Sequence, residues 1–273
     1  MTNNTISAER LLANTHTLFN VLNTIIWFPF VGFMVKVVNK IIPGEEVSIE
    51  RGLVHLDERM LNTPQAAVSQ VNMEITRMHG IVQEMVIESR RAVIDKDKEI
   101  IKRIKHKEEI INEIEEELLI YLTNIPHTSL PDEDIKVLDS YFSIVDDIES
   151  IADDANSIAE LSEYIIENDL EFSEEATNSI KNAYDIVIDY LDDSRKIIKT
   201  GDKGIADRLF EGEEKMDKIL LQYRDDHLQR LNKGICIPSA GIAYLEILED
   251  LEHISDQFAD IAYSVIERER KSA

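Results

Sequence analysis

Cysteine is nearly absent from this sequence of 273 residues, in which Cys236 is the only example. A single cysteine cannot close an internal disulfide bond, and it leaves no cysteine pair for a zinc cluster. Disulfide bonds mark many extracellular domains, so the bulk of the chain is expected in a reducing compartment.

Glycine and proline are scarce as well, with 9 and 6 residues. Because these residues supply the turns of β-rich folds, their shortage disfavours a sandwich or barrel and favours long helices. The hydrophobic share of 44% still suffices for a sizeable core. The expected fold class is all-α.

Basic residues are too few to balance the acids, since 29 Lys and Arg stand against 54 Asp and Glu and give a formal net charge of −25. Such a surface repels the phosphodiester backbone, so nucleic acid is not an expected partner. The acidic excess favours cations, basic protein partners or simple solubility.

Charge of either sign is missing between Arg10 and Lys36. The apolar run from Leu18 to Val35 is about long enough to cross the hydrocarbon core of a membrane as a helix. By the positive-inside rule, the lysines that follow place everything downstream in the cytoplasm. We therefore expect a transmembrane segment over residues 1–42 and a location in the cell membrane, with a buried helix of a globular core as the alternative.

Apolar residues at three-to-four spacing, together with capping signals, predict six further helices. They are expected over residues 63–94, 98–122, 135–167, 176–199, 203–231 and 240–268. The second set of three repeats the first, since "DKEIIKRIKHKEEIINEI" from Asp97 aligns without a gap with "DKGIADRLFEGEEKMDKI" from Asp202. The sequence thus predicts a linker and two repeated antiparallel three-helix bundles. Their expected bounds are 43–62 for the linker, 63–170 for the first bundle and 171–273 for the second.

One acidic phrase occurs twice. "DIESIADDANSIA" from Asp147 returns as "DLEHISDQFADIA" from Asp250, 103 residues later. Beside the acids in each copy runs an apolar stripe with helical spacing, so the acids should border the seam of a bundle rather than lie opposite it.

Each phrase places two carboxylates one helical turn apart, Glu149 with Asp153 and Glu252 with Asp256. Like charges at this spacing destabilise a helix, whereas a bound cation would reverse that effect. Oxygen ligands of this kind suit iron, manganese, magnesium and calcium. The residues alone leave two interpretations open, a metal site and a solvated helix face.

Both acidic phrases resemble the E-x-x-x-D motifs of PhoU proteins, and the duplicated three-helix bundle resembles their fold. The stretches "HTLFNVLNTIIWFPFVGFMVKVVNKIIPG" and "LDERMLNTPQAA" resemble the junction between the last membrane segment and the PhoU-like domain of bacterial NptA-type sodium-dependent phosphate symporters. "HLQRLNKGICIPSAGIAYLEILEDLEHISD" is similar to the second motif region of the same group.

The resemblance implies bound metal, namely iron in multinuclear clusters, with manganese, zinc, magnesium or calcium as alternatives. The ligands it implies are Glu149, Asp153, Glu252 and Asp256, with Asp147 and Asp250 as additional ligands and Glu109, Asn112, Glu214 and Asp217 as support from the neighbouring helices.

The function implied by the resemblance is a cytoplasmic regulatory module of a sodium/phosphate cotransport system. Its expected partners are the membrane and a separate or missing sodium/phosphate transport core, and a homo-oligomer is a further candidate. No catalytic residue is expected, because the Glu-x-x-His pairs of di-iron oxidases and the glycine-rich phosphate loop are both missing. The alternative is a structural helical adaptor that binds a membrane or signalling partner without metal.

Overall fold

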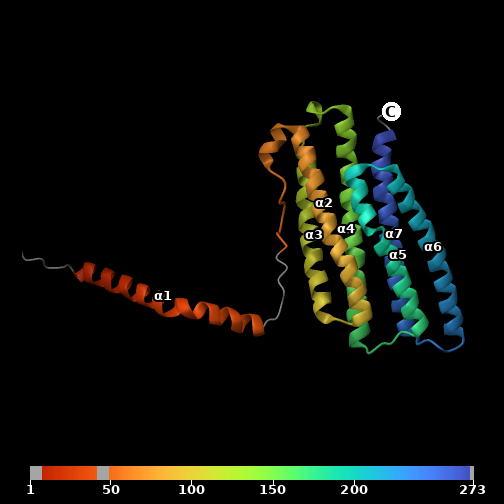
Figure 1. Cartoon of the computed structure of the whole chain (residues 1–273), viewed down its shortest axis with the longest axis horizontal. Helices are drawn as coiled ribbons and strands as arrows, with labels where there is room; N and C mark the ends of the chain where they lie inside the picture. The colour runs from red at the N-terminus through yellow and green to blue at the C-terminus, as the bar shows by residue number, and fades with distance from the viewer. Residues whose placement is uncertain (1–7, 42–48, 271–273) are drawn as a thin grey trace, which may run out of the picture. The chain divides into compact units, whose positions relative to one another are not determined.

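The computed structural model describes residues 8–41 and 49–270, and all regular structure within these ranges is helical. The chain divides into two units between Ile49 and Glu50. The first unit contains helix α1, and the second contains six long helices with two short 3₁₀ helices (Figure 1). The expected all-α class is confirmed.

Helix α1 (Ala8–Ile41) carries polar groups along its length. The hydroxyls of Thr17 and Thr24 each donate to the backbone carbonyl one turn earlier at 2.9 Å. The side chains of His16 and Asn20 lie 3.1 Å apart, also one turn from each other. These polar groups are therefore satisfied within the helix itself.

No helix within residues 8–41 and 49–270 combines the length and the apolarity that crossing a membrane requires. The transmembrane segment expected over residues 1–42, and with it the membrane location, is therefore not supported. Large apolar side chains of α1, from Leu12 to Met34, are nevertheless exposed.

Two three-helix bundles form the second unit. The first contains α2 (Pro64–Asp95), α3 (Lys98–Asn124) and α4 (Asp132–Glu167), and the second contains α5 (Glu174–Thr200), α6 (Lys203–Asn232) and α7 (Pro238–Arg270). All six predicted helices are present. Helix α4 begins earlier than predicted, because Asp132, Glu133 and Asp134 form an acidic first turn that suits the positive end of the helix dipole.

The same tight turn joins the first two helices of each bundle. Lys96 and Gly201 both adopt the left-handed conformation, with φ of 53° and 60°. Asp97 and Asp202 follow them, and each side chain caps the next helix by accepting two backbone N–H bonds. Equivalent positions in the two repeats thus share both backbone conformation and capping.

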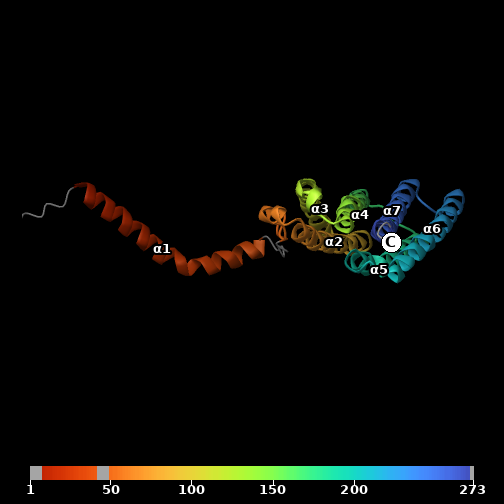
Figure 2. The same cartoon turned by 90° about the horizontal axis from the view of Figure 1, so that it is seen from above.

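Helices α4 and α7 lie side by side between α3 and α6, while α2 and α5 pack on one side of this row and contact each other (Figure 2). Ser157 contacts Asp250 and Asp154 contacts His253, so the two helices run antiparallel. In this register Ala152 lies opposite Ser255, its own equivalent in the repeat. The bundles are therefore related by an approximate twofold axis that passes through the α4–α7 contact.

The expected apolar stripe forms the core on both sides of this axis. The buried members are Ile144, Ile148, Ile151, Ala155 and Ile158 on α4, and Ile247, Leu251, Ile254, Phe258 and Ile261 on α7. Burial of this stripe fixes the rotation of both helices, and the acidic side chains consequently emerge at its edges.

The described part of the predicted linker is held against the first bundle, whereas residues 42–48 lie outside the described residues. Glu74 of α2 is 0% exposed, and its carboxylate accepts the backbone N–H of His55 at 2.9 Å and pairs with Arg77. Arg77 in turn donates to the carbonyl of Gly52 at 2.7 Å. Because a buried carboxylate requires such partners, this network ties residues 50–55 to α2.

We expect Glu74→Ala to lower the free energy of unfolding by about 3 kcal/mol, because it leaves Arg77 and two backbone N–H groups without their acceptor. Urea unfolding measures this change, and limited proteolysis should show earlier cleavage within residues 49–57. Glu117→Ala is the matched control, since Glu117 accepts a single exposed N–H bond from Leu53 at 3.2 Å and should cost less than about 1 kcal/mol. Equal effects of the two variants would contradict this account.

Candidate metal centre

Three carboxylates of the second bundle converge at the α6–α7 contact. Glu213 and Asp217 lie one turn apart on α6, and Asp256 reaches them from α7. One carboxylate oxygen from each lies within 4.8 Å of the other two. Glu213 and Asp256 are half-buried and Asp217 is exposed, so the group is open to solvent on one side.

Burial raises the pKa of Asp256 to about 6, and the negative charges of Asp217, Glu213 and Glu252 add to this shift. The pKa of Glu213 is also raised, by burial and by Asp217. A cation held between these oxygens would offset the repulsion, so the residues present fit a metal that prefers oxygen ligands.

Three of the expected ligands of the second bundle, Glu214, Asp250 and Glu252, lie outside this group. Glu252 forms an ion pair with Arg224 of α6, which already neutralises its charge. Glu214 is exposed and pairs with Lys218 at 3.1 Å. Asp217 and Asp256 thus come together as expected, while Glu213 occupies the place that was expected for Glu214.

The first bundle carries a different acidic group at the α3–α4 contact. Burial raises the pKa of Glu149 to about 7, and the charges of Asp153, Glu115 and Asp146 contribute. Burial also raises the pKa of Asp153. Glu115 of α3, whose pKa is raised by burial and by Asp146, was not among the expected ligands. The sequence could have indicated Glu115, because it directly follows Ile114, an apolar residue of the helix that is buried in the core.

The first bundle does not reproduce the three-carboxylate group of the second. Asn112 and Glu108 occupy the positions equivalent to Asp217 and Glu213, and the Asn112 amide donates to Glu108 at 2.6 Å. Glu109 is exposed, and its carboxylate lies 3.7 Å from Arg51. The expected supporting residues Glu109 and Asn112 are therefore engaged with other partners.

A third acidic group lines the α4–α7 contact itself. Burial and the nearby charge of Asp260 raise the pKa of Asp147 to about 7. One oxygen of Asp147 is buried without a hydrogen-bond partner. At the position related by the approximate twofold axis, Asp250 accepts a hydrogen bond from Ser157 at 2.9 Å. The two copies of the motif thus differ at this position, where only Asp250 has a hydroxyl partner.

Asp154 adds a further carboxyl to the same contact. Burial and the charge of Asp250 raise its pKa to about 7, although His253 lies 3.8 Å away and acts in the opposite direction. Asp250 itself has its pKa raised to about 6, mainly by burial. The expected additional ligands Asp147 and Asp250 therefore lie at the contact between the bundles and are not members of the three-carboxylate group.

Both bundles match one protein-family model, the PhoU domain, over residues 75–162 and 180–265. These matches cover more than half of the chain. The chain belongs to the PhoU family. One PhoU match lies in each bundle, as expected for an internal repeat.

Solved PhoU structures share this fold. The crystal structure of PhoU from Pseudomonas aeruginosa superposes with a TM-score of 0.71 and 19% identity, over 77% of this chain and 99% of that one. The phosphate transport system regulatory protein PhoU from Streptococcus pneumoniae gives a TM-score of 0.69 and 19% identity, over 76% and 97%. The expectation of a PhoU-like fold is confirmed.

Curated relatives extend over nearly the whole chain. The "Putative inorganic phosphate export protein YjbB" of Salmonella typhimurium is 22% identical over 95% of this chain and 48% of its own length. The protein of the same name from Escherichia coli strain K12 is 22% identical over 93% and 47%. The chain therefore spans about half the length of these relatives. Their names refer to phosphate export. The expected identity of this chain with a sodium-dependent symporter is not shown.

We expect Asp147→Asn to stabilise the protein at high pH, measured by urea unfolding in the presence of a chelator. The native carboxyl keeps a proton up to a pH of about 7, whereas the unfolded chain releases it near 3.8, so ionisation weakens the wild type as the pH rises through this window. The expected gain at pH 8 is about 1–2 kcal/mol, allowing for solvent that reaches this half-buried group. It should shrink as the pH falls toward 4.

Asp250→Asn is the comparison variant, because Ser157 already stabilises the Asp250 carboxylate. Its gain at pH 8 should be smaller than that of Asp147→Asn. A stabilisation by Asp147→Asn that does not change with pH would refute the electrostatic explanation.

Proposed function

We propose that this PhoU-family chain is a regulatory module of a phosphate transport system, that it binds metal ions through its carboxylate groups, and that it performs no catalysis. The observation that carries the metal part is the convergence of Glu213, Asp217 and Asp256 within 4.8 Å. The proposed role in phosphate transport is supported by the names of the relatives, which refer to phosphate export and to the regulation of phosphate transport.

Oxygen atoms are the only ligands that this three-carboxylate group offers. Iron, manganese, magnesium and calcium fit such a set, with iron as the first candidate from the resemblance to PhoU proteins. Glu149 and Asp153, together with Glu115, would hold a second ion in the first bundle. The ion would supply positive charge that links two helices, and the protein supplies the spacing of the carboxylates.

Metal binding would regulate a partner through the packing of the helices. A ligand shifts a conformational equilibrium only by its different affinity for the two states. An ion that joins α6 to α7 favours the arrangement in which Asp256 meets Glu213 and Asp217. A partner that contacts this bundle would then respond to metal occupancy, which is an allosteric coupling between two sites.

The proposed partner is a phosphate transport core, sodium-coupled as the resemblance implies. Helix α1 exposes large apolar side chains between Leu12 and Met34, and a surface of this kind favours contact with another apolar surface. We propose that α1 contacts apolar helices of the transport core. The PhoU bundles would then act on the cytoplasmic side of that assembly.

Glu213→Gln/Asp256→Asn should abolish metal binding in the second bundle, because two of the three charges that attract the cation are lost. The full chain is loaded with iron or manganese, dialysed and measured by elemental analysis, and its thermal unfolding is followed with and without metal. A ligand at 100 times its Kd stabilises the native state by about 2.7 kcal/mol, which the variant should lose. Glu214→Gln is the matched control and should retain the metal.

The same measurement of thermal unfolding with and without metal distinguishes this proposal from the alternative function, a structural adaptor. A helical adaptor without a metal site would show no stabilisation by metal in the wild type. If the double variant and the wild type respond equally to iron and to manganese, the three-carboxylate group is not the metal site.

A second test addresses transport. In cells that carry this chain in place of their own copy, Glu213→Gln/Asp256→Asn should change the rate of phosphate movement severalfold, within the usual range of allosteric coupling. Radioactive phosphate uptake and release measure this rate, and Glu214→Gln again serves as the control. A variant that has lost its metal but leaves both rates unchanged would separate metal binding from transport control.

A further inference from the structure

An open cavity of about 230 Å³ lies at the end of the second bundle where α5 and α7 begin and α6 ends. Buried side chains from all three helices line it, Ala176 of α5, His227 of α6 and Tyr244 of α7. Ile235 and Ile237 of the α6–α7 loop also line it and are exposed. The cavity thus leads from apolar side chains at the surface to the core. Residues 171–176, His227 and 235–244 make up this open end of the second bundle.

Helices α2 and α5 are equivalent in the two repeats, and the contact between them shows their register. The Nε2 atom of His79 lies 2.9 Å from the Ser194 hydroxyl, and the Tyr184 hydroxyl lies 2.8 Å from the Ser89 hydroxyl. The approximate twofold axis relates these two contacts. Tyr184 therefore corresponds to His79, and Ser194 corresponds to Ser89.

In this register α5 lacks the first turn of α2. Helix α2 begins at Pro64, whose equivalent is Asp169, whereas α5 begins at Glu174. Ala67 in the first turn of α2 is fully buried, so this turn closes the core of the first bundle. Its equivalent, Phe172, precedes α5 and lines the cavity. The cavity therefore lies where the first bundle has an apolar helical turn.

Side chains on the other two helices add to this difference. Leu122 of α3 and Leu138 of α4 are fully buried in the first bundle. Their equivalents are His227 of α6 and Gly241 of α7. A Cβ atom at Gly241 would lie 2.7 Å from His227 Nε2, so the imidazole ring packs against bare backbone. Two leucines that fill the first bundle thus have no apolar side chain in their place in the second.

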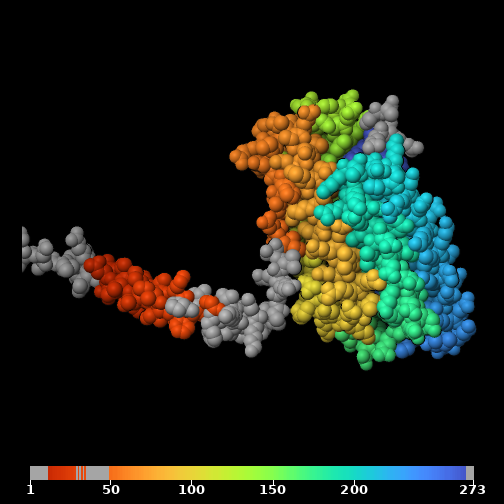
Figure 3. All heavy atoms as spheres, in the orientation of Figure 1, coloured from red at the N-terminus to blue at the C-terminus, as the bar shows by residue number. Residues whose placement is uncertain are grey.

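The connecting loops at these two ends differ in the same way. In the α3–α4 loop, Ile125 and Leu130 are 2% and 8% exposed. In the α6–α7 loop, Ile235 and Ile237 are 60% and 57% exposed. Figure 3 shows the α4–α5 loop (green) and the α6–α7 loop (blue) at the lower surface of the second unit. The second bundle therefore leaves apolar side chains uncovered at its open end, and their burial by a partner would be favourable.

The segment that leads into α5 is strongly acidic. Residues 167–175 contain no basic residue, and their acidic residues are all exposed. These acids are Glu167, Asp169, Glu171, Glu174 and Glu175. Glu171 itself lines the cavity, and Lys233 is the only basic residue of the α6–α7 loop. A partner with lysine or arginine beside its apolar side chains would therefore meet complementary charge.

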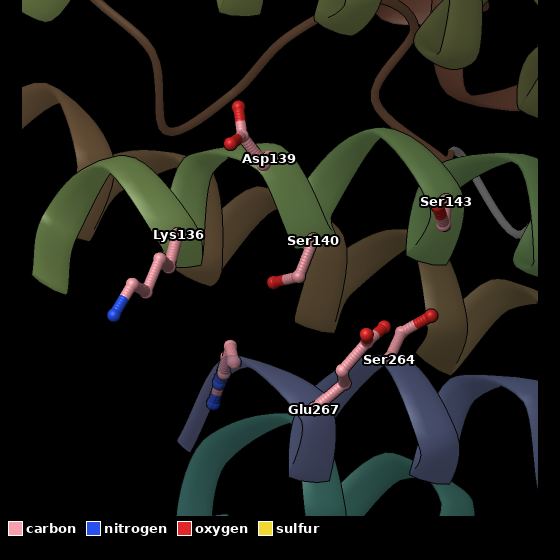
Figure 4. Close-up of a pocket in the computed structure, with 7 residues that line it drawn as sticks. Lys136, Asp139, Ser140, Ser143, Ser264 and Glu267 are labelled. Carbon is pink, nitrogen blue, oxygen red and sulfur yellow. The ribbon is translucent and has the colours of Figure 1, made fainter. Parts of the chain in front are cut away.

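The cavity between α4 and α7 differs from this one because its polar groups are already engaged (Figure 4). Lys136 and Glu267 point into the space between these helices, and both interact with other groups of the chain. The Ser140 hydroxyl donates to the carbonyl of Val137 at 2.7 Å. The open end of the second bundle, by contrast, leaves apolar side chains without a cover.

We propose that the open end binds a helical segment of a partner protein, whose apolar side chains enter the cavity and whose lysine or arginine residues lie beside them. The apolar turn of α2 at the equivalent place argues for a helical and apolar occupant, and the acidic residues 167–175 argue for basic neighbours. Cytoplasmic segments next to membrane helices carry an excess of Lys and Arg, so a membrane transport core can supply such a segment. The inference rests on the proposed function only for what this partner does.

Cys236 provides a direct test, because it is the only cysteine of the chain and lines the cavity. The rate at which a neutral maleimide modifies the native full chain reports whether the open end is covered. Three synthetic amphipathic peptides are the probes, one of Leu and Lys, one of Ser and Lys, and one of Leu and Glu. At ten times its Kd, the Leu/Lys peptide should slow the modification about tenfold, because only the free protein reacts. The other two should leave the rate nearly unchanged.

Ile235→Ser/Ile237→Ser should weaken binding of the Leu/Lys peptide by about tenfold or more, because two apolar side chains no longer contribute to burial. The affinity follows from the Cys236 rate at increasing peptide concentration, with each variant's own rate without peptide as the reference. Leu221→Ser is the matched control, since Leu221 is exposed on α6 outside the cavity lining. It should bind the peptide as the wild type does.

Glu171→Gln/Glu174→Gln tests the charge. This variant should weaken binding of the Leu/Lys peptide about threefold at low salt, and the difference should vanish at high salt, as expected for exposed charge pairs. Glu116→Gln/Glu133→Gln removes two exposed acids of the first bundle and should have no effect. Circular dichroism checks that each variant is folded.

The proposal is overturned if the Leu/Lys peptide does not protect Cys236, if either of the other peptides protects it equally, or if the isoleucine variant binds like the wild type. Protection that rises with protein concentration in the absence of peptide would assign the open end to a second copy of the chain and would also overturn it. No metal enters this measurement, so its failure would leave the proposed metal site and regulatory role standing.

Discussion

The antiparallel contact between α4 and α7 determines most of what this molecule can do. It buries the apolar stripe of both helices, and it brings Ala152 and Ser255 together at its centre. Both acidic motifs lie on these two helices, so their rotation decides which carboxylates meet. Helix α3 then completes one acidic group in the first bundle, and helix α6 completes another in the second.

Carboxylates at the edge of this contact are costly, and the structure shows where the cost is met. Glu252 is neutralised by Arg224, and Asp250 accepts a hydroxyl from Ser157. Asp147 and Asp256 have no comparable partner, and their pKa values rise to about 7 and about 6. The remaining unbalanced charge is what makes a cation a fitting ligand.

Helical periodicity and the internal repeat allowed the six helices and the position of the acids beside the core to be predicted from the sequence. The choice of Glu213 over Glu214 could not be predicted, because it depends on the rotation of α6, which the burial of Gly212 and Met216 sets. Arg224 pairs with Glu252 across two helices, and spacing along one helix cannot reveal such a partner.

Differences between the two repeats carry more information about function than their similarities do. The shared frame, with the same turns and the same aspartate caps, is sufficient to fold either bundle. Where Asp217 is replaced by Asn112, the first bundle loses a carboxylate and gains an internal hydrogen bond. Arg268 donates to the Ile198 carbonyl at the end of α5, whereas its equivalent Ile165 is a buried apolar residue of the first bundle. Packing thus tolerates both versions at equivalent positions, and the proposed metal site uses the carboxylate that the second bundle carries at Asp217.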